Sequence, residues 1–319
     1  MRLSLIAALL LGALLALTNC RTTSERSKQT GGPADATAQR FEPTPENMRR
    51  VIAAVKHLHK PMGAPLPGDW LTTSPEPGQT FDEYLQSNPT KPVGERRVLY
   101  VQPLGDFTPA RRRVVTLAAD YMSRFFNLPV RVREDMPLKD VPRDMQRRHP
   151  DWGDRQVRAG YVTMKLLLPT LPSDAAALIA FTSTDLYPDE TMNFVFGQAS
   201  LSERVGVWSL YRLGDPDASE ADFSQTLVRT LKIATHETGH MFSIPHCTKY
   251  ECVMSGSNSL SETDRRPIDL CPECMAKICW ATGTDPRERY ARLAAFCTER
   301  GLIAERRFFE DSLRALEKS

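Results

Sequence analysis

The sequence has almost no excess of charge of either sign. Its 41 lysines and arginines nearly balance 39 aspartates and glutamates, which leaves a net charge of +2. Aromatic residues do not alternate with the basic clusters, so neither feature favours a nucleic-acid-binding surface. No internal repeat is visible, which argues against a repeat architecture. With 41% hydrophobic residues among 319, the chain is long enough for a substantial core in one or two domains.

Long apolar runs are also scarce. The run Leu3–Leu17 follows Arg2 and is too short for a stable membrane span, but it suits the apolar part of a secretory signal. It leads into Leu17-Thr18-Asn19-Cys20, which is similar to the lipobox of bacterial lipoproteins, where the cysteine is acylated. Asn19 departs from the small residue that is usual before that cysteine. We therefore expect residues 1–19 to be a signal peptide of the lipoprotein type.

This N-terminus predicts a location outside the cytoplasm. We expect an extracytoplasmic bacterial lipoprotein that is anchored to a membrane through Cys20, in the periplasm or at the cell surface. Ordinary secretion and an uncleaved anchor are the alternatives, and both also place the protein outside the cytoplasm. Residues 20–45 are rich in small and polar side chains and are expected to form a flexible tether. Residues 46–319 are expected to form the folded domain.

Histidine and cysteine are few, but they are concentrated in one stretch. Three of the six histidines lie within residues 236–246, and four of the seven cysteines within residues 247–274. The stretch reads H-E-T-G-H-M-F-S-I-P-H-C-T-K-Y-E-C-V-M and, after sixteen more residues, C-P-E-C. This grouping is the strongest functional signal in the chain.

The histidine spacing predicts a catalytic zinc site. His236 and His240 are four residues apart, so on a helix their rings lie on one face about one turn apart, with Glu237 beside them. His246 supplies a third ligand. Three protein nitrogens leave the fourth tetrahedral position open for water, which is typical of a catalytic site. A surface helix with two solvated histidines is the alternative, which the third histidine and the cysteines disfavour. The pattern therefore indicates a hydrolase.

The surrounding chain alternates strand and helix signals. Apolar periodicity and turn residues predict short strands packed with long helices, an α+β arrangement. Strands are expected at 98–102, 130–133, 178–182, 193–199 and 204–213, and helices at 46–60, 108–128, 156–168 and 220–242.

The helix that carries the first two histidines must end soon after His240 if His246 is to reach the same ion. Glycine is the natural residue at such a bend, because a left-handed backbone costs other residues about 1–2 kcal/mol. Here the sequence has Ser243, followed by Pro245, which prevents the helix from continuing. We expect the third ligand to be retained.

These motifs together resemble those of the archaemetzincins, a branch of the metzincin metallopeptidases. The resemblance includes D-L-Y-P-D-E-T-M-N-F-V-F-G-Q-A-S-L upstream and M-S-G-S-N-S-L-S-E-T-D-R-R-P-I-D-L-C-P-E-C downstream, and it covers residues 97–281. Ser243 is the one departure in the central motif, where metzincins have glycine. The resemblance implies a metzincin-like zincin domain: a twisted mixed sheet packed with long helices, then an active-site helix, a Met-turn and a small four-cysteine zinc subdomain.

The resemblance also implies roles for individual residues. His236, His240 and His246 would bind the catalytic zinc, and Glu237 would act as general base toward the zinc-bound water. Met254 would take the place of the Met-turn methionine; a core methionine is the compatible alternative. The strand at 193–201 would pair with the substrate backbone, although its alternation equally fits a core strand.

The same family carries a second zinc site. Cys247, Cys252, Cys271 and Cys274 match it, and four thiolates would close the coordination of a structural ion. Outside the cytoplasm the four could instead form two disulfides. Cys279 and Cys297 lie outside the pattern and are either a disulfide or two buried thiols. We expect two zinc ions per chain, one catalytic and one structural.

The sequence thus predicts a membrane-anchored zinc peptidase that acts on peptides or proteins. We expect a monomer without a nucleic-acid partner. Two alternatives stay open: a non-catalytic zinc-stabilised peptide-binding module, and a zinc hydrolase that acts on another class of substrate.

Overall fold

The computed structural model describes residues 41–200 and 202–318. The expected signal peptide, the candidate acylation site Cys20 and the first part of the expected tether lie outside the described residues. The residues from Phe41 onward form one compact unit. No helix within the described ranges is both long enough and apolar enough to cross a membrane.

Two mixed sheets form the upper part of this unit. The larger sheet has the order β2-β1-β5-β8-β7, in which β7 is antiparallel to β8 and the other neighbours are parallel. The smaller sheet has the order β3-β4-β6. The strands are β1 (Val98–Leu104), β2 (Val130–Val132), β3 (Gln146–Arg148), β4 (Arg155–Arg158), β5 (Ala175–Thr182), β6 (Asp185–Tyr187), β7 (Gly197–Ser200) and β8 (Val205–Ser209).

The central strand β5 is buried on both faces, because each face of the larger sheet is covered. Ala177, Ile179 and Phe181 pack in the core shared with α4 (Pro109–Phe126) and α6 (Glu220–Met241). Leu178 and Ala180 point the other way, into a second core that includes Val162 and Leu167. The continuous apolar run of β5 is what a parallel strand between two layers requires.

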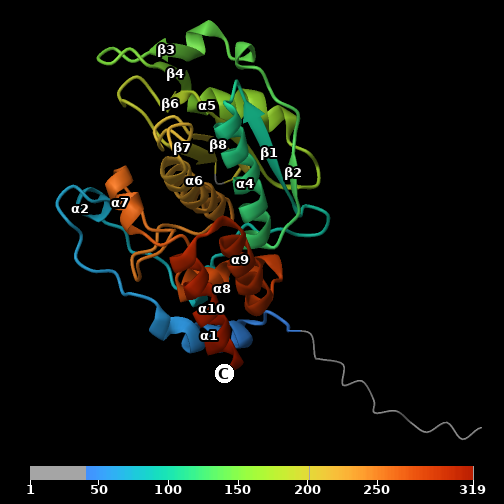
Figure 1. Ribbon diagram of the computed structural model, residues 1–319. Helices are drawn as coiled ribbons and strands as arrows, with labels where there is room; N and C mark the ends of the chain where they lie inside the picture. The colour runs from blue at the N-terminus through green and yellow to red at the C-terminus, as the bar shows by residue number, and fades with distance from the viewer. Residues whose placement is uncertain (1–40, 201, 319) are drawn as a thin grey trace, which may run out of the picture. The chain divides into compact units, whose positions relative to one another are not determined.

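The two long helices α4 and α6 pack against each other beside the larger sheet (Figure 1). Thr108 caps α4 by accepting a hydrogen bond from the Arg111 backbone N–H, and Ser219 caps α6 in the same way through Asp222. These helices confirm the predictions for residues 108–128 and 220–242. The C-terminal half of α6 carries the first two histidines.

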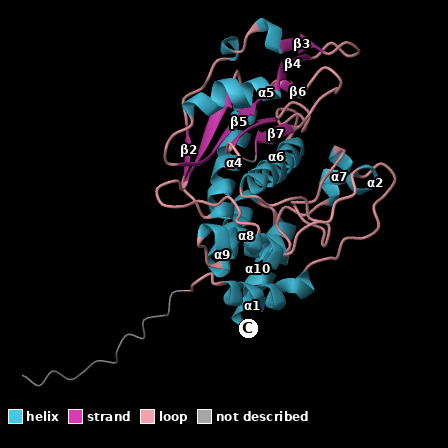
Figure 2. Ribbon diagram, turned by 180° about the vertical axis from the view of Figure 1, so that it is seen from behind, coloured by secondary structure: helices cyan, strands magenta, loops and turns pink. Residues whose placement is uncertain are grey.

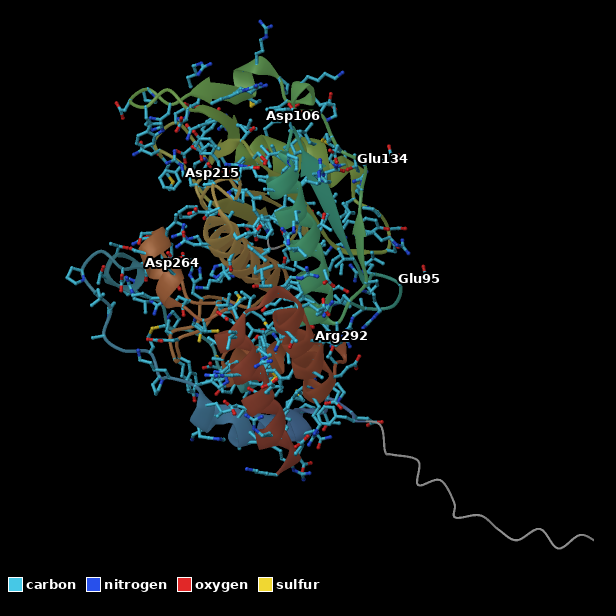
Figure 3. All side chains as sticks on the ribbon, viewed as in Figure 1. Glu95, Asp106, Glu134, Asp215, Asp264 and Arg292 are labelled. Atoms are coloured by element: carbon cyan, nitrogen blue, oxygen red, sulfur yellow. The ribbon has the colours of Figure 1, made fainter. Side chains whose placement is uncertain are left out.

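Below the sheet, helices from both ends of the described chain form a second layer (Figures 1 and 2). α1 packs against α8 and α10, and α3 packs against α8. The remaining helices are α1 (Pro45–Val55), α2 (Trp70–Thr73), α3 (Phe81–Gln86), α5 (Ala159–Tyr161), α7 (Leu260–Arg265), α8 (Pro272–Thr282), α9 (Pro286–Arg300) and α10 (Ile303–Glu317). Asp264 marks α7 in the side-chain view (Figure 3).

The structure corrects the predicted helix at 156–168. Its first residues belong to β4, which pairs with β3 and β6, and only the segment after Arg158 is helical, with a π-helical stretch at Val162–Leu167. The predicted strand at 204–213 is also shorter, because β8 ends at Ser209. The expected mixed sheet packed with long helices is confirmed.

Candidate metal centres

Helix α6 and the turn after it bring three histidines together. The Nε2 atoms of His236 and His240 are 3.0 Å apart. His246 joins them from beyond the turn, and one ring nitrogen from each of the three lies within 4.8 Å of the others. The histidines named from the sequence therefore form one cluster.

The turn after α6 is a Schellman motif. The Ile244 N–H donates to Gly239 O and the Ser243 N–H donates to His240 O, the bond pair of that motif. Ser243 occupies its left-handed position with φ of 62°. The serine hydroxyl accepts a hydrogen bond of 2.9 Å from the Thr90 backbone N–H, a contact that glycine could not make. The turn thus returns His246 to the cluster with serine in place of glycine.

Each of the three histidines has an acceptor at its Nδ1 atom. An Nδ1–H that is held in this way leaves the lone pair of Nε2 free to bind a metal. The contacts are His236 with Val253 O at 2.7 Å, His240 with Ile244 O at 2.7 Å, and His246 with the Glu76 carboxylate at 2.9 Å.

The electrostatics of the cluster agree with a cation site. Burial lowers the pKa of His236 and of His240 to about 4, so both are neutral at pH 7. Burial raises the pKa of the neighbouring Glu237 carboxyl. Nitrogens bound tetrahedrally to zinc at about 2.0–2.1 Å lie about 3.3 Å apart, close to the separation of His236 and His240. The three imidazoles therefore fit a zinc ion with an open position.

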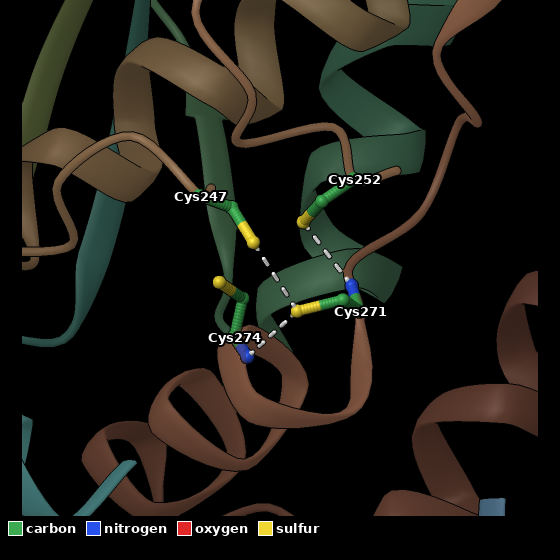
Figure 4. A group of neighbouring side chains, drawn as sticks. All are labelled: Cys247, Cys252, Cys271 and Cys274. Carbon is green, nitrogen blue, oxygen red and sulfur yellow. Dashed lines mark hydrogen bonds between the residues drawn. The ribbon is translucent and has the colours of Figure 1, made fainter. Parts of the chain in front are cut away.

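The four predicted cysteines form a second cluster (Figure 4). Cys252, Cys271 and Cys274 are at most 1% exposed, and Cys247 is 7% exposed. The sulfurs of Cys247 and Cys271 are 3.6 Å apart, against about 3.8 Å for two thiolates on one tetrahedral zinc and about 2.05 Å for a disulfide. All four are free thiols, so the alternative of two disulfides is not formed.

Backbone N–H groups point at the sulfurs of this cluster. Cys252 Sγ accepts from the N–H of Cys271 at 3.1 Å and of Met254 at 3.4 Å. Cys271 Sγ accepts from the Cys274 N–H at 3.5 Å, because Cys271 is the N-cap of α8. Burial raises the pKa of the Cys252 thiol, and thus a thiolate there requires a cation beside it. The residues fit a structural zinc.

The two clusters share one loop. Cys247 follows His246 directly, and its N–H donates to Met254 O at 2.8 Å. Met254 is fully buried, and a Cβ at Gly239 would lie only 2.5 Å from its sulfur. Glycine between Glu237 and His240 therefore lets Met254 pack against α6.

A pocket of about 580 Å³ opens over the histidines and Glu237. The segment Met192–Gly197, which leads into β7, forms one wall. Ile233, Val253, Asn258 and Trp70 also line the pocket. Apolar and polar side chains beside the histidine cluster suit an organic substrate.

Trp70 and Glu76 are the site residues that sequence reasoning missed. Glu76 contacts His246 across 170 positions, and Trp70 Nε1 donates to Glu76 at 3.1 Å. No spacing rule connects residues so distant. The only local signal is a short acidic and proline-rich stretch, S-P-E-P-G, in an irregular segment.

Cys279 and Cys297 are buried thiols, and neither forms a disulfide. Burial raises the pKa of each to about 12, so both stay protonated. The sequence left open a disulfide or two buried thiols for this pair, and the structure has two buried thiols.

Comparison with known proteins places this geometry in a family. Residues 171–279 match the profile of Peptidase family M54. Archaemetzincin-2 from Homo sapiens is 32% identical over 277 residues, which cover 77% of this chain and 76% of that protein. Archaemetzincin from Archaeoglobus fulgidus is 31% identical over 180 residues, 56% of this chain and 98% of that protein.

A solved structure is also similar. The crystal structure of archaemetzincin from Methanopyrus kandleri is 29% identical, covers 59% of this chain and 96% of that chain, and superposes with a TM-score of 0.47. The sequence likeness over most of the chain, together with the histidine and cysteine clusters, leads to one conclusion: the chain belongs to the archaemetzincin family and is a zinc metallopeptidase.

Proposed function

We propose that the chain hydrolyses peptide bonds at the histidine cluster, with Glu237 as the general base. The observation that carries this proposal is the convergence of three imidazoles and one carboxylate in the lining of a single pocket. Zinc supplies a Lewis acid that acidifies water and polarises a carbonyl. The site residues have the same identities as in the motif that the sequence shares with metzincins.

Glu237 would move the protons of the reaction. It precedes His240 by three residues on α6 and lines the pocket, so its carboxylate faces the place where a peptide carbonyl would lie. The carboxylate accepts a proton as water attacks the carbonyl carbon, and it then delivers that proton to the leaving amine nitrogen. A partly buried carboxyl with a raised pKa is suited to both steps.

The outer edge of β7 is a candidate for binding the substrate backbone. β7 is the last strand of the larger sheet, and the Ser209 N–H donates to Phe196 O. Because antiparallel bonding alternates, Gly197 and Ala199 direct their backbone groups to the open edge. An extended peptide could add there as a further strand, beside the pocket that Gly197 lines.

We also propose the metzincin assignment of Met254, two zinc ions per chain and action as a monomer. The packing of Met254 against Gly239 supports the first, and the two separate ligand sets support the second. Membrane anchoring through an acylated Cys20 rests on the sequence alone. Mass spectrometry of the mature N-terminus tests it, because an unmodified start at another residue would contradict it.

The test of peptide hydrolysis is Glu237→Gln. We expect its kcat on a peptide substrate to fall by about 10²–10⁴-fold with its zinc content unchanged, since only the proton transfer is lost. Glu220→Gln, an exposed change in the first turn of the same helix, is the control. Equal activity of both variants would contradict the role of Glu237. No cleavage of any peptide by the wild type would favour the binding-module alternative.

A further inference from the structure

The third histidine of the cluster is held differently from the other two. His236 and His240 donate from Nδ1 to backbone carbonyls of neighbouring loops, whereas His246 Nδ1 faces both oxygens of Glu76, at 3.0 and 2.9 Å. A carboxylate is a stronger acceptor than a carbonyl and carries a charge. His246 also follows a turn rather than lying on α6, so its ring depends more on such a contact.

Trp70 contacts both members of this pair. Trp70 Nε1 donates to the Glu76 carboxylate at 3.1 Å, and the Trp70 ring packs edge-on to His246, with ring centres 5.0 Å apart. The Trp70 backbone N–H donates to Glu262, which is 1% exposed. A Cβ at Gly256 would lie 2.3 Å from the Trp70 ring, so this glycine permits the close packing.

The segment that carries Glu76 contacts the end of α6 at two further points. Tyr84 Oη donates to Phe242 O at 2.8 Å, and the Thr90 N–H donates to Ser243. Together with the contact between Glu76 and His246, these bonds hold the stretch from the end of α6 to His246. The N-terminal segment therefore positions the part of the site that the helix cannot hold.

We propose that Glu76 is a positioning residue for the catalytic metal, acting through His246. Its carboxylate keeps the His246 proton on Nδ1, orients the ring, and strengthens Nε2 as a ligand. This inference rests on the proposed function only in naming the histidine cluster as the catalytic site. Its direct consequence is a dependence of metal affinity on a residue 170 positions away.

The test measures metal binding rather than turnover. Glu76→Ala and Glu76→Gln are compared with the wild type by chelator competition for zinc and by the visible absorption of the cobalt-substituted protein. We expect Glu76→Ala to bind the histidine-site metal 10–100-fold more weakly, with an altered cobalt spectrum. Glu76→Gln keeps an acceptor without the charge, so we expect a smaller loss. The cysteine site is an internal reference, because cobalt bound by thiolates absorbs differently from cobalt bound by imidazoles.

Asp82→Asn is the matched control. Asp82 lies in the same segment, is 56% exposed, and pairs with Arg49 at 2.8 Å. If Glu76→Ala and Glu76→Gln bind zinc as tightly as Asp82→Asn and keep the wild-type cobalt spectrum, the proposal is wrong and Glu76 is a surface anchor for its segment. Weakened binding in a protein that cleaves no peptide would support the role of Glu76 while contradicting the proposed function.

Discussion

At the scale of single residues, Ser243 shows how the chain keeps its metal site without the expected glycine. A left-handed serine costs about 1–2 kcal/mol of backbone free energy. Its hydroxyl recovers part of this through the bond from Thr90, since such a bond contributes about 0.5–1.5 kcal/mol. Serine in place of glycine therefore costs backbone free energy, but it links the turn after α6 to the segment that carries Thr90.

The opposing contributions of backbone and hydrogen bond predict that two substitutions of Ser243 change the free energy of unfolding differently. Ser243→Ala loses the hydrogen bond and keeps the left-handed backbone, so we expect the free energy of unfolding to fall by about 1 kcal/mol. Ser243→Gly loses the bond but relieves the backbone, so we expect little net change. Urea unfolding of the zinc-loaded proteins measures both. A glycine variant less stable than the alanine variant would contradict this account of the turn.

The sequence predicted which histidines and cysteines cluster, because the spacing within each cluster is largely local. His236 and His240 share a helix face, and Cys271 and Cys274 share a helix start, so short spacings suffice. Glu76 was not predicted, because its contact with His246 depends on the tertiary path of an irregular segment. The sequence showed Ser243 where glycine suits the turn, but its bond to Thr90 depends on the tertiary path of that same segment.

At the scale of elements, α7 is held against α6 by an ion pair. Arg229 and Asp264 form two hydrogen bonds of 2.9 and 2.6 Å, and Thr263 and Arg266 beside this pair line the pocket. The hydrogen bond and charge of Arg229 lower the pKa of Asp264. The position of one pocket wall is thus linked to the ionisation of an acid.

The pair predicts a pH-dependent contribution to stability. Because the folded pKa of Asp264 is lowered, its contribution is present above the unfolded value of about 3.9 and is lost as pH falls through the folded pKa. Asp264 is 36% exposed, so we expect Asp264→Asn to cost at most about 1 kcal/mol at pH 7 and less at pH 3. Urea unfolding at both pH values measures the difference. An equal cost at both would contradict the ion-pair explanation.

The accuracy of element prediction follows from element length. The helices α4 and α6 are long enough for their periodicity to show, whereas β4 has four residues and runs directly into a helical turn. A short strand that pairs on both sides carries no alternation of its own. The sequence therefore located the helix that carries His236 and His240 but not the smaller sheet.

At the scale of the whole molecule, two separate ligand sets predict two zinc ions per chain. Elemental analysis of a chain that begins at Phe41 measures the number directly. We expect two ions in the wild type and one each in His240→Ala and Cys271→Ala, because each substitution breaks one set. A single ion that only the histidine variant loses would show that the cysteines do not bind zinc.

Burial of the N-terminal helices predicts that the residues before Arg97 are needed for a stable fold. Met48, Val55, Phe81 and Tyr84 are at most 1% exposed, and burial of each contributes roughly 1.5–3 kcal/mol. Their sum is comparable with the total stability of a typical domain. We therefore expect a chain that begins at Arg97 to lose most of its stability in thermal unfolding. Unfolding at the same temperature as the chain from Phe41 would contradict this.

The different burial of the two clusters predicts different residence times for a metal bound at each. The histidines line an open pocket, so an ion bound there would exchange with the solution while the protein stays folded. The cysteine sulfurs are enclosed, so an ion bound there would leave only when the surrounding loops open. The histidine site would therefore follow the metal supply of its surroundings from moment to moment, while the cysteine site would keep the metal that was present when the chain folded.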